Sequence, residues 1–327
     1  MARSGNRESA GAAAMSGAPS IAIIGFGEAG SILGEELARG GSAVVTYDIL
    51  LVAPAARAAM LRKAERAGVR TAAGVPQALA GAGLVISAVT ASSSVDVAGR
   101  AAAVLGAGQF FLDINSVAPS TKRECARLVE QSGADYVEAA VMAPVPPHRL
   151  TVPMLLGGRR AGALAAELRA LGMNATEIAS RIGVASAVKM CRSVVIKGLE
   201  ALTLESLLAA RRFGAEREVL ASLEQSFPHM GWADSLPDYL VSRIAEHGRR
   251  RAAEMREVAR TLADVGVEPT MAEATALRQD ALVDAMANRG WSFERGAPFS
   301  GRALADALTA SAPDTAAAPE GPAKEER

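Results

Sequence analysis

The sequence has few aromatic residues, few lysines and few cysteines, and it carries no excess of charge. Only 4% of its 327 residues are aromatic, and 35 basic side chains balance 35 acidic ones. Nucleic acids and anionic membrane surfaces attract proteins with an excess of positive charge, so the balance argues against both as partners. Half of the residues are apolar, as in globular proteins. We therefore expect a small-molecule ligand.

The two cysteines, Cys125 and Cys191, lie far apart and form no Cys-x-x-Cys pair. This spacing predicts neither a disulfide framework nor a zinc site, and we expect no bound metal. It suits a reducing compartment, and we expect a cytoplasmic protein. Lys197, Glu200 and Glu205 interrupt the longest apolar helical stretch. No segment is therefore expected to cross a membrane.

The two ends of the chain have compositions that do not favour folding. Residues 1–19 contain Glu8 and scattered Gly and Ser where a signal peptide would need an unbroken apolar run. Residues 310–327 are rich in Ala, Pro and Glu and can bury little apolar surface. We predict a disordered tail at each end.

Lysine is scarce among the basic residues. Arginine accounts for 30 of the 35, and the five lysines stand at positions 63, 122, 189, 197 and 324. An amine can exchange a proton near neutral pH when its pKa is lowered, whereas a guanidinium stays protonated. A lysine in this chain is therefore a candidate proton donor and acceptor.

Short β-branched runs alternate with amphipathic stretches between residue 20 and about residue 180. The runs IAIIG, AVVTYD, LVISAV and QFFLDIN are each followed by a helical pattern. This alternation is the signature of a parallel sheet with right-handed crossovers. Two further apolar runs, DYVEAAVM and VPMLLGG, would extend the sheet. We predict an α/β Rossmann domain with a doubly wound, mostly parallel sheet over residues 20–182.

Helical patterns fill the chain from residue 183 to residue 309. A helix of roughly 30 residues is expected directly after Gly183, and breaks are expected near Phe227-Pro228, Gly231 and Pro269. The second half is therefore predicted to be an all-α domain, joined to the first without a flexible linker.

A glycine-rich motif follows the first predicted strand and precedes a helix expected from Ser31 onward. In such a motif one glycine makes a tight turn, a second lets the backbone approach a pyrophosphate, and a third lets helix pack on strand. The helix N-terminus adds amide donors and a partial positive charge. The residues predicted to bind a dinucleotide are Gly25, Phe26, Gly27, Glu28, Ala29 and Gly30.

The second predicted strand ends at Tyr47-Asp48. A carboxylate at this point accepts hydrogen bonds from the adenosine ribose and repels a 2′-phosphate, which favours NAD over NADP. The alternative is a glycine-rich turn beside a surface aspartate. Val89 and Thr90, after the run LVISA, are expected to contact the cofactor through their backbone.

Asn115 and Ser116 follow the run QFFLD, at the sheet edge where α/β proteins place ligands. There they could hold the substrate hydroxyl or the nicotinamide ribose. Alternatively, they cap a helix that begins near Pro119.

Several segments fall in the order seen in the β-hydroxyacid dehydrogenases, the family of 3-hydroxyisobutyrate and 6-phosphogluconate dehydrogenases. Residues 113–119 resemble the family's D-x-S-T-x-S-P segment, and residues 152–158 look like its sheet-closing strand ending in Gly-Gly. Residues 183–189 are similar to the G-x-G-x-x-x-K that opens its long interdomain helix. The likeness covers nearly the whole chain. It is greatest to a 6-phosphogluconate-dehydrogenase-like branch with its own C-terminal domain.

The resemblance implies an NAD-dependent oxidoreductase that transfers a hydride between nicotinamide and a hydroxyl-bearing carbon of a small hydroxy acid or related alcohol. Lys189 matches the family's catalytic lysine and would shuttle the proton. The helical domain would bind substrate and form a homodimer. An imine reductase of the same architecture and a non-catalytic NAD sensor remain the alternatives.

The chain departs from the family pattern at two substrate positions. Met142-Ala143-Pro144 stands where the family has Ser-Gly-Gly, so a hydroxyl donor is lost and Pro144 offers no N–H. Ser193 stands where the family has Asn one turn after its lysine. These departures argue against a 3-hydroxyisobutyrate or 6-phosphogluconate substrate, although Met142, Ala143 and Ser193 stay candidate substrate contacts.

Two further sets of charged residues are candidate substrate contacts. Lys197 shares a predicted helix with Lys189, and either could instead be an ordinary solvated lysine. Another helical face could grip a carboxylate or phosphate, or could form a solvated or dimer-interface ion network. Its members are His247, Arg250, Arg251 and Glu254. The other three lysines show no comparable pattern.

Overall fold

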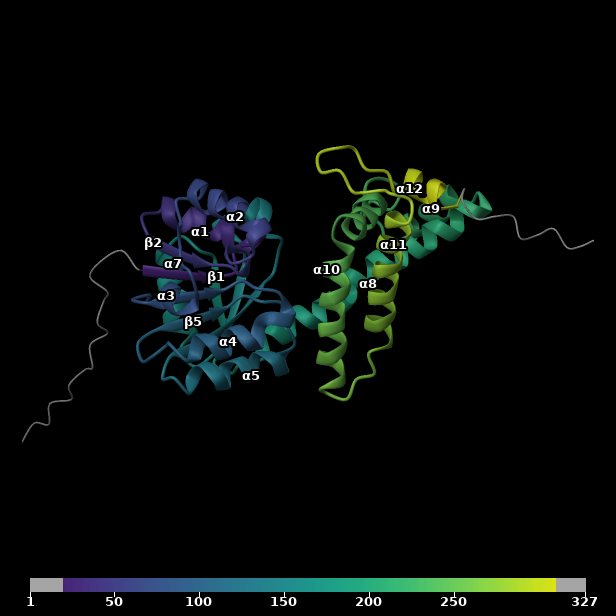
Figure 1. The fold of residues 1–327 in the computed structure, drawn as a ribbon. Coiled ribbons are helices and arrows are strands. Elements are labelled where there is room, and N and C mark those ends of the chain that lie inside the picture. The colour runs from purple at the N-terminus through teal and green to yellow at the C-terminus, as the bar shows by residue number, and fades with distance from the viewer. Residues whose placement is uncertain (1–19, 310–327) are drawn as a thin grey trace, which may run out of the picture. The chain divides into compact units, whose positions relative to one another are not determined.

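The computed structural model describes residues 20–309 (Figure 1). The two tails predicted to be disordered, residues 1–19 and 310–327, lie outside the described residues. The chain forms two compact units that divide between Met190 and Cys191. This division falls inside a long helix, whereas the predicted boundary between residues 182 and 183 stands just before that helix begins.

The first unit is built on an eight-stranded sheet with the order β3-β2-β1-β4-β5-β6-β7-β8. Neighbouring strands pair in parallel except β6 and β7, which are antiparallel. The predicted doubly wound, mostly parallel sheet is thus confirmed. Its strands are β1 (Ser20–Ile24), β2 (Ala43–Tyr47), β3 (Arg70–Thr71), β4 (Leu84–Ser87), β5 (Phe110–Asp113), β6 (Asp135–Val141), β7 (Met154–Gly157) and β8 (Ala175–Ala179).

Helices cover both faces of this sheet. One face packs against α1, α2 and α7, and the other packs against α3, α4 and α5 (Figure 1). Residues of β1 alternate between the two cores, with Ile23 in one and Ile24 in the other, because successive side chains of a strand point to opposite faces. Burial on both faces explains the nearly continuous apolar runs in the sequence. The helices are α1 (Glu28–Arg39), α2 (Pro54–Arg66), α3 (Val75–Leu79), α4 (Ser94–Ala102), α5 (Pro119–Glu130), α6 (Val145–His148) and α7 (Ala161–Ala170), with 3₁₀ turns at Ile49–Leu51, Ala91–Ser93 and Arg149–Thr151.

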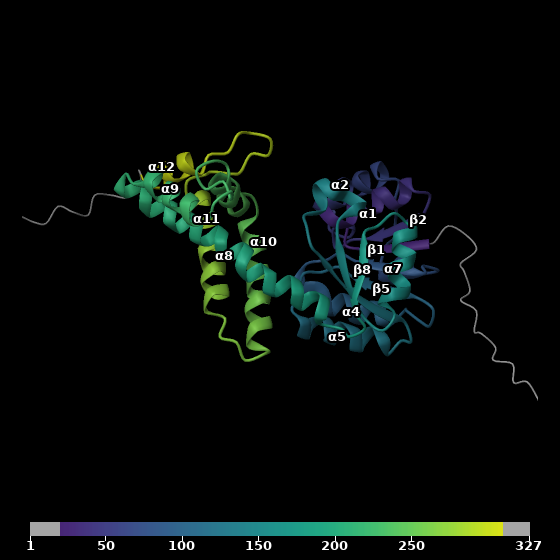
Figure 2. The ribbon, with the colours of Figure 1, turned by 180° about the vertical axis from the view of Figure 1, so that it is seen from behind.

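The regular elements of the second unit are all helices within the residues that the structure describes, as predicted. Its helix α11 begins directly after Pro269, and α10 and α11 lie side by side (Figure 2). Leucine, isoleucine, valine and methionine side chains of α8, α10 and α11 form its core. None of the described helices combines the length and the hydropathy needed to cross a membrane. The helices are α8 (Val184–Phe213), α9 (Glu216–Ser226), α10 (Leu236–Ala263), α11 (Thr270–Ala287) and α12 (Gly301–Thr309).

Candidate cofactor and catalytic site

The glycine loop between β1 and α1 has the shape that a dinucleotide requires. Gly25 has a φ of +91°, and a Cβ at this position would lie 2.4 Å from the carbonyl oxygen of Ala88. A Cβ at Gly30 would lie 2.0 Å from the carbonyl oxygen of Gly25. At Gly27, by contrast, a Cβ would meet no atom of the described residues within 4 Å, so this side of the loop faces open space. A pyrophosphate could therefore approach the backbone there, at the N-terminus of α1.

Two charged side chains hold the loop by hydrogen bonds to its backbone. Asp48 Oδ2 accepts the backbone N–H of Phe26 at 2.6 Å, and Asp48 Oδ1 accepts that of Leu50 at 2.8 Å. Lys63 Nζ donates to the carbonyl oxygens of Phe26 and Gly27, at 2.8 Å each. Both polar backbone groups of Phe26 are thus used inside the protein, so Phe26 supports the loop rather than offering its N–H to a ligand.

Asp48 is buried, in contrast to the surface aspartate of the alternative interpretation. Burial lowers the pKa of Lys63, and the negative charges of Asp48 and Glu28 oppose that shift. No sequence pattern indicated a role for Lys63, because this lysine lies outside any motif and reaches the loop from α2.

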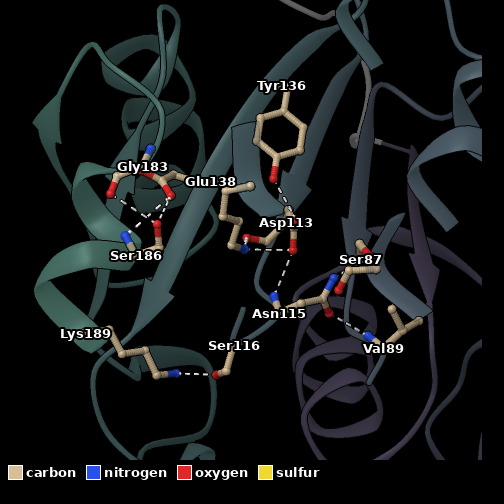
Figure 3. Close-up of polar contacts among 12 residues, drawn as sticks. Ser87, Val89, Asp113, Asn115, Ser116, Tyr136, Glu138, Gly183, Ser186 and Lys189 are labelled. Atoms are coloured by element: carbon tan, nitrogen blue, oxygen red, sulfur yellow. Dashed lines mark hydrogen bonds and ion pairs between the residues drawn. The ribbon is translucent and has the colours of Figure 1, made fainter. Parts of the chain in front are cut away.

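Asp113 organises the segment that follows β5. This carboxylate is buried, and its Oδ1 lies 2.9 Å from Lys122 Nζ and accepts the backbone N–H of Asn115 at 2.9 Å. Its Oδ2 accepts the hydroxyl of Tyr136 at 2.7 Å (Figure 3). Burial and the charge of Asp113 raise the pKa of Tyr136 well above its ordinary value. Tyr136 therefore stays a hydrogen-bond donor to Asp113. Through the bond to the N–H of Asn115, Asp113 also holds the first residues after β5 in place.

Asn115 links the ends of β4 and β5. Its Oδ1 accepts the backbone N–H of Val89 at 2.7 Å, and its Nδ2 donates to Ser87 Oγ at 3.0 Å (Figure 3). The N–H of Val89 is thus used in a hydrogen bond inside the protein. Thr90 is exposed, and its hydroxyl is within hydrogen-bond distance of the hydroxyls of Ser92 and Ser93. Helix α5 has Ala118 as its N-cap, without a side-chain cap bond, so the helix-capping alternative for Asn115 and Ser116 is wrong.

Lys189 and Ser116 meet at the carboxyl edge of the sheet. Lys189 lies in the second turn of α8, and its Nζ donates to Ser116 Oγ at 2.6 Å (Figure 3). The contact is partly buried and joins segments 73 residues apart. The structure therefore places an amine, a hydroxyl and the neighbouring amide of Asn115 along one edge of the sheet.

The segment after β6 replaces the family's Ser-Gly-Gly with residues that pack. Met142 donates its backbone N–H to the carbonyl of Pro153 at 2.9 Å, and Ala143 packs against the core. Farther along, Arg149 pairs with Glu35 and Glu36 of α1, at 2.6 and 2.5 Å. These residues hold the segment to the sheet and to α1.

The second unit contains a buried network of paired charges. Lys197 Nζ lies 2.5 Å from Glu254 Oε2, and Arg251 forms a bidentate pair with Glu200. Lys197 and Glu200 are 6% and 2% exposed, so neither is a solvated surface charge. Burial lowers the pKa of Lys197 and raises that of Glu200.

The four residues of the helical face predicted to bind an anion do not form a single anion-binding group. Arg251 and Glu254 are already paired with residues of α8, Arg250 is exposed, and His247 is half-buried with its Nε2 3.3 Å from Glu246. Sequence spacing placed these residues on one face but did not show that α8 covers part of that face. Ser193 is buried.

Comparisons with known proteins agree with this architecture. Residues 20–167 match the NAD-binding domain of 6-phosphogluconate dehydrogenase, and residues 210–282 match a domain of unknown function, DUF1932. The fold and the glycine loop thus define a dinucleotide-binding protein.

A conserved hypothetical protein from Sinorhizobium meliloti 1021 is 38% identical, over 90% of this chain and 97% of that one, with a TM-score of 0.72. A conserved protein of unknown function, reported to be structurally similar to 3-hydroxyacid dehydrogenases, is 31% identical over 80% and 97% of the two chains, with a TM-score of 0.61. The 3-hydroxyisobutyrate dehydrogenase of Mycobacterium tuberculosis shares the fold at 17% identity, over 89% and 99% of the chains, with a TM-score of 0.65. The chain belongs to the β-hydroxyacid dehydrogenase superfamily and carries a C-terminal domain of its own type.

Proposed function

We propose that the protein is a nicotinamide-dependent oxidoreductase that acts on a hydroxyl-bearing carbon of a small hydroxy acid or related alcohol. The observation that carries this proposal is the 2.6 Å contact between Lys189 Nζ and Ser116 Oγ, beside the buried Asn115. These groups lie at the carboxyl edge of the sheet that bears the glycine loop, where α/β proteins bind ligands.

A bound nicotinamide would accept or supply the hydride. Lys189 would remove the hydroxyl proton during oxidation and return a proton to the carbonyl oxygen during reduction. Ser116 would hold the amine in place through its hydroxyl. Asn115 would keep the ends of β4 and β5 together beneath the reacting groups.

NAD is the cofactor that Asp48 favours, because its buried carboxylate would repel a 2′-phosphate. Gly27, Glu28 and Ala29 would carry the pyrophosphate at the start of α1. In this proposal residues 20–182 bind the cofactor, and residues 183–309 contribute to substrate selection and to a homodimer.

The test is an absorbance assay of NADH formation or consumption with panels of hydroxy acids, alcohols and cyclic imines. Lys189→Met should lower kcat by about 10²- to 10⁴-fold, the usual contribution of a positioned acid or base, with unchanged affinity for NADH. Arg192→Met, which removes an exposed cation from the same helix, is the matched control and should keep wild-type activity.

An equally active Lys189→Met variant would refute the proton-shuttle role. Turnover of imines alone would favour the imine reductase. Binding of NADH without turnover of any compound would favour the non-catalytic sensor.

A further inference from the structure

A buried carboxylate holds the start of the helix that carries Lys189. Glu138 lies in the middle of β6 and is fully buried. Its Oε1 accepts the backbone N–H groups of Gly183 and Ala185, at 2.7 and 3.0 Å. Its Oε2 accepts the hydroxyl of Ser186 at 2.7 Å and the N–H of Ser186 at 3.4 Å (Figure 3).

All four contacts of Glu138 are hydrogen bonds that its carboxylate oxygens accept, three from backbone N–H groups and one from the hydroxyl of Ser186. The first amides of a helix lack acceptors within the helix, and the positive end of the helix dipole favours an anion. Glu138 therefore serves as the N-terminal cap of α8, although it comes from a strand far away in the sequence.

Gly157 leaves the space that this carboxylate occupies. It is the register partner of Glu138 on β7. A Cβ at Gly157 would lie 2.6 Å from Glu138 Oε1, closer than any real side chain tolerates. The glycine at position 157 is thus explained by the carboxylate on the neighbouring strand.

Two adjacent carboxylates anchor the two sides of the contact between Lys189 and Ser116. Asp113 and Glu138 are register partners on β5 and β6. Asp113 fixes the chain that leads to Ser116, and Glu138 fixes the turn of α8 that leads to Lys189. Because Ser186 and Lys189 are one helical turn apart, a shift of that first turn moves the amine directly.

We propose that Glu138 is a positioning residue for the proton shuttle: by holding the first turn of α8, it sets where Lys189 meets Ser116. The catalytic consequence rests on the proposed function. The geometric consequence, a changed environment of the Lys189 amine, can be measured without any substrate.

The scarcity of lysine makes that measurement feasible. Reductive methylation with ¹³C-formaldehyde labels accessible lysine amines, and the chain has only five lysines, of which Lys122 is fully buried. The methyl signal of Lys189 is assigned by its loss in Lys189→Arg. Its chemical shift is then followed against pH in wild type and in Glu138→Gln.

Glu138→Gln should shift the titration midpoint of the Lys189 signal by about half a pH unit or more, because the amine loses its fixed partner and surroundings. The Lys63 signal should stay in place. Asp135→Asn is the matched control, since it makes the same change on the same strand at a carboxylate that pairs with two exposed arginines, Arg159 and Arg160.

The proposal is overturned if Glu138→Gln leaves the Lys189 signal as it is in Asp135→Asn while the amides of residues 183–186 lose protection from hydrogen exchange. Glu138 would then only stabilise the helix end. If Glu138→Gln does not fold, Ser186→Ala removes one donor and keeps the charge. It should shift the Lys189 signal in the same sense by a smaller amount, and an unchanged signal would overturn the proposal equally.

Activity separates this inference from the proposed function. With a substrate found in the panels, Glu138→Gln should lower kcat by about 10- to 100-fold at unchanged NADH affinity, as expected for a displaced catalytic group. An active Lys189→Met variant together with a shifted Lys189 signal in Glu138→Gln would refute the shuttle and keep the positioning. An inactive Lys189→Met variant together with an unchanged Lys189 signal in Glu138→Gln would keep the proton shuttle and refute the positioning role of Glu138.

Discussion

Replacing Lys122 by Met should destabilise the first unit by removing the counter-charge of Asp113. Lys122 is fully buried and Asp113 is 1% exposed, so water cannot take the place of the lost ammonium group. Lys122 Nζ also donates to the carbonyl oxygen of Asp113 at 2.8 Å, and this bond is lost as well. Breaking a buried ion pair by removing one partner typically costs about 3–5 kcal/mol.

The remaining contacts of Asp113 set the expected magnitude within that range. Tyr136 and the N–H of Asn115 still donate to the carboxylate, and hydrogen bonds to charged groups contribute about 1.5–3 kcal/mol each. We therefore expect a loss near the lower end, about 3 kcal/mol. Adding Asp113→Asn removes the stranded charge and should recover part of the loss, about 1–3 kcal/mol.

The assay is urea unfolding monitored by hydrogen exchange at the backbone amides of residues 110–141. These amides report on the first unit separately from the second. Arg123→Met, at the exposed next position of α5, is the control and should change stability by less than about 0.5 kcal/mol. The reasoning is refuted if Lys122→Met costs less than about 1 kcal/mol, or if the double variant is no more stable than the single one.

Four further predictions follow from the glycine loop, the cysteines and the helical unit. Gly27→Ala should weaken NADH binding at least about 10-fold in a fluorescence titration and leave the melting temperature unchanged, because its Cβ points into open space; unchanged affinity would contradict the loop's role. Burial raises the pKa of the Cys125 thiol to about 12, so Ellman's reagent at pH 8 should titrate only the exposed Cys191 in the native protein and both thiols after unfolding. Arg251→Met should cost about 3–5 kcal/mol in urea unfolding by stranding Glu200. Burial raises the pKa of Glu200, so at this group the folded state binds a proton more tightly than the unfolded state. The unfolding free energy of wild type relative to Glu200→Gln should therefore fall as pH rises from the ordinary value of 4.5 towards the raised pKa; a rise in this difference would contradict the prediction.

The cofactor half of the molecule could be predicted because its signals are local. Strand and helix periodicities appear within each segment, and Gly25, Gly27 and Gly30 stand directly between a strand and a helix. The relation of Lys189 to the sheet edge came from a resemblance over several segments rather than from any single pattern.

The supporting contacts could not be predicted, because they join residues far apart in the chain. Lys63 and Phe26 are 37 residues apart, and Glu138 and Ser186 are 48 apart. A lysine on an amphipathic helix has the same local pattern whether it is solvated or reaches a neighbouring loop. A glutamate within an apolar strand pattern gives no local sign of its role, because the helix end that it caps lies far away in the sequence.

The same reason explains the misjudged face of α10. Spacing along a helix shows which residues share a face, but it does not show what packs against that face. Arg251 is directed to Glu200 of α8, and that pairing depends on how the helices pack within the second unit.

Gly157 constrains how relatives of this protein can vary. It has no side chain and lies on a different strand from the carboxylate, yet the space it leaves determines whether Glu138 can reach α8. Positions 138 and 157 should therefore change together: a relative with a larger residue at 157 is expected to carry a shorter acid or a neutral residue at 138. A designer who alters either position alone should expect to disturb Lys189.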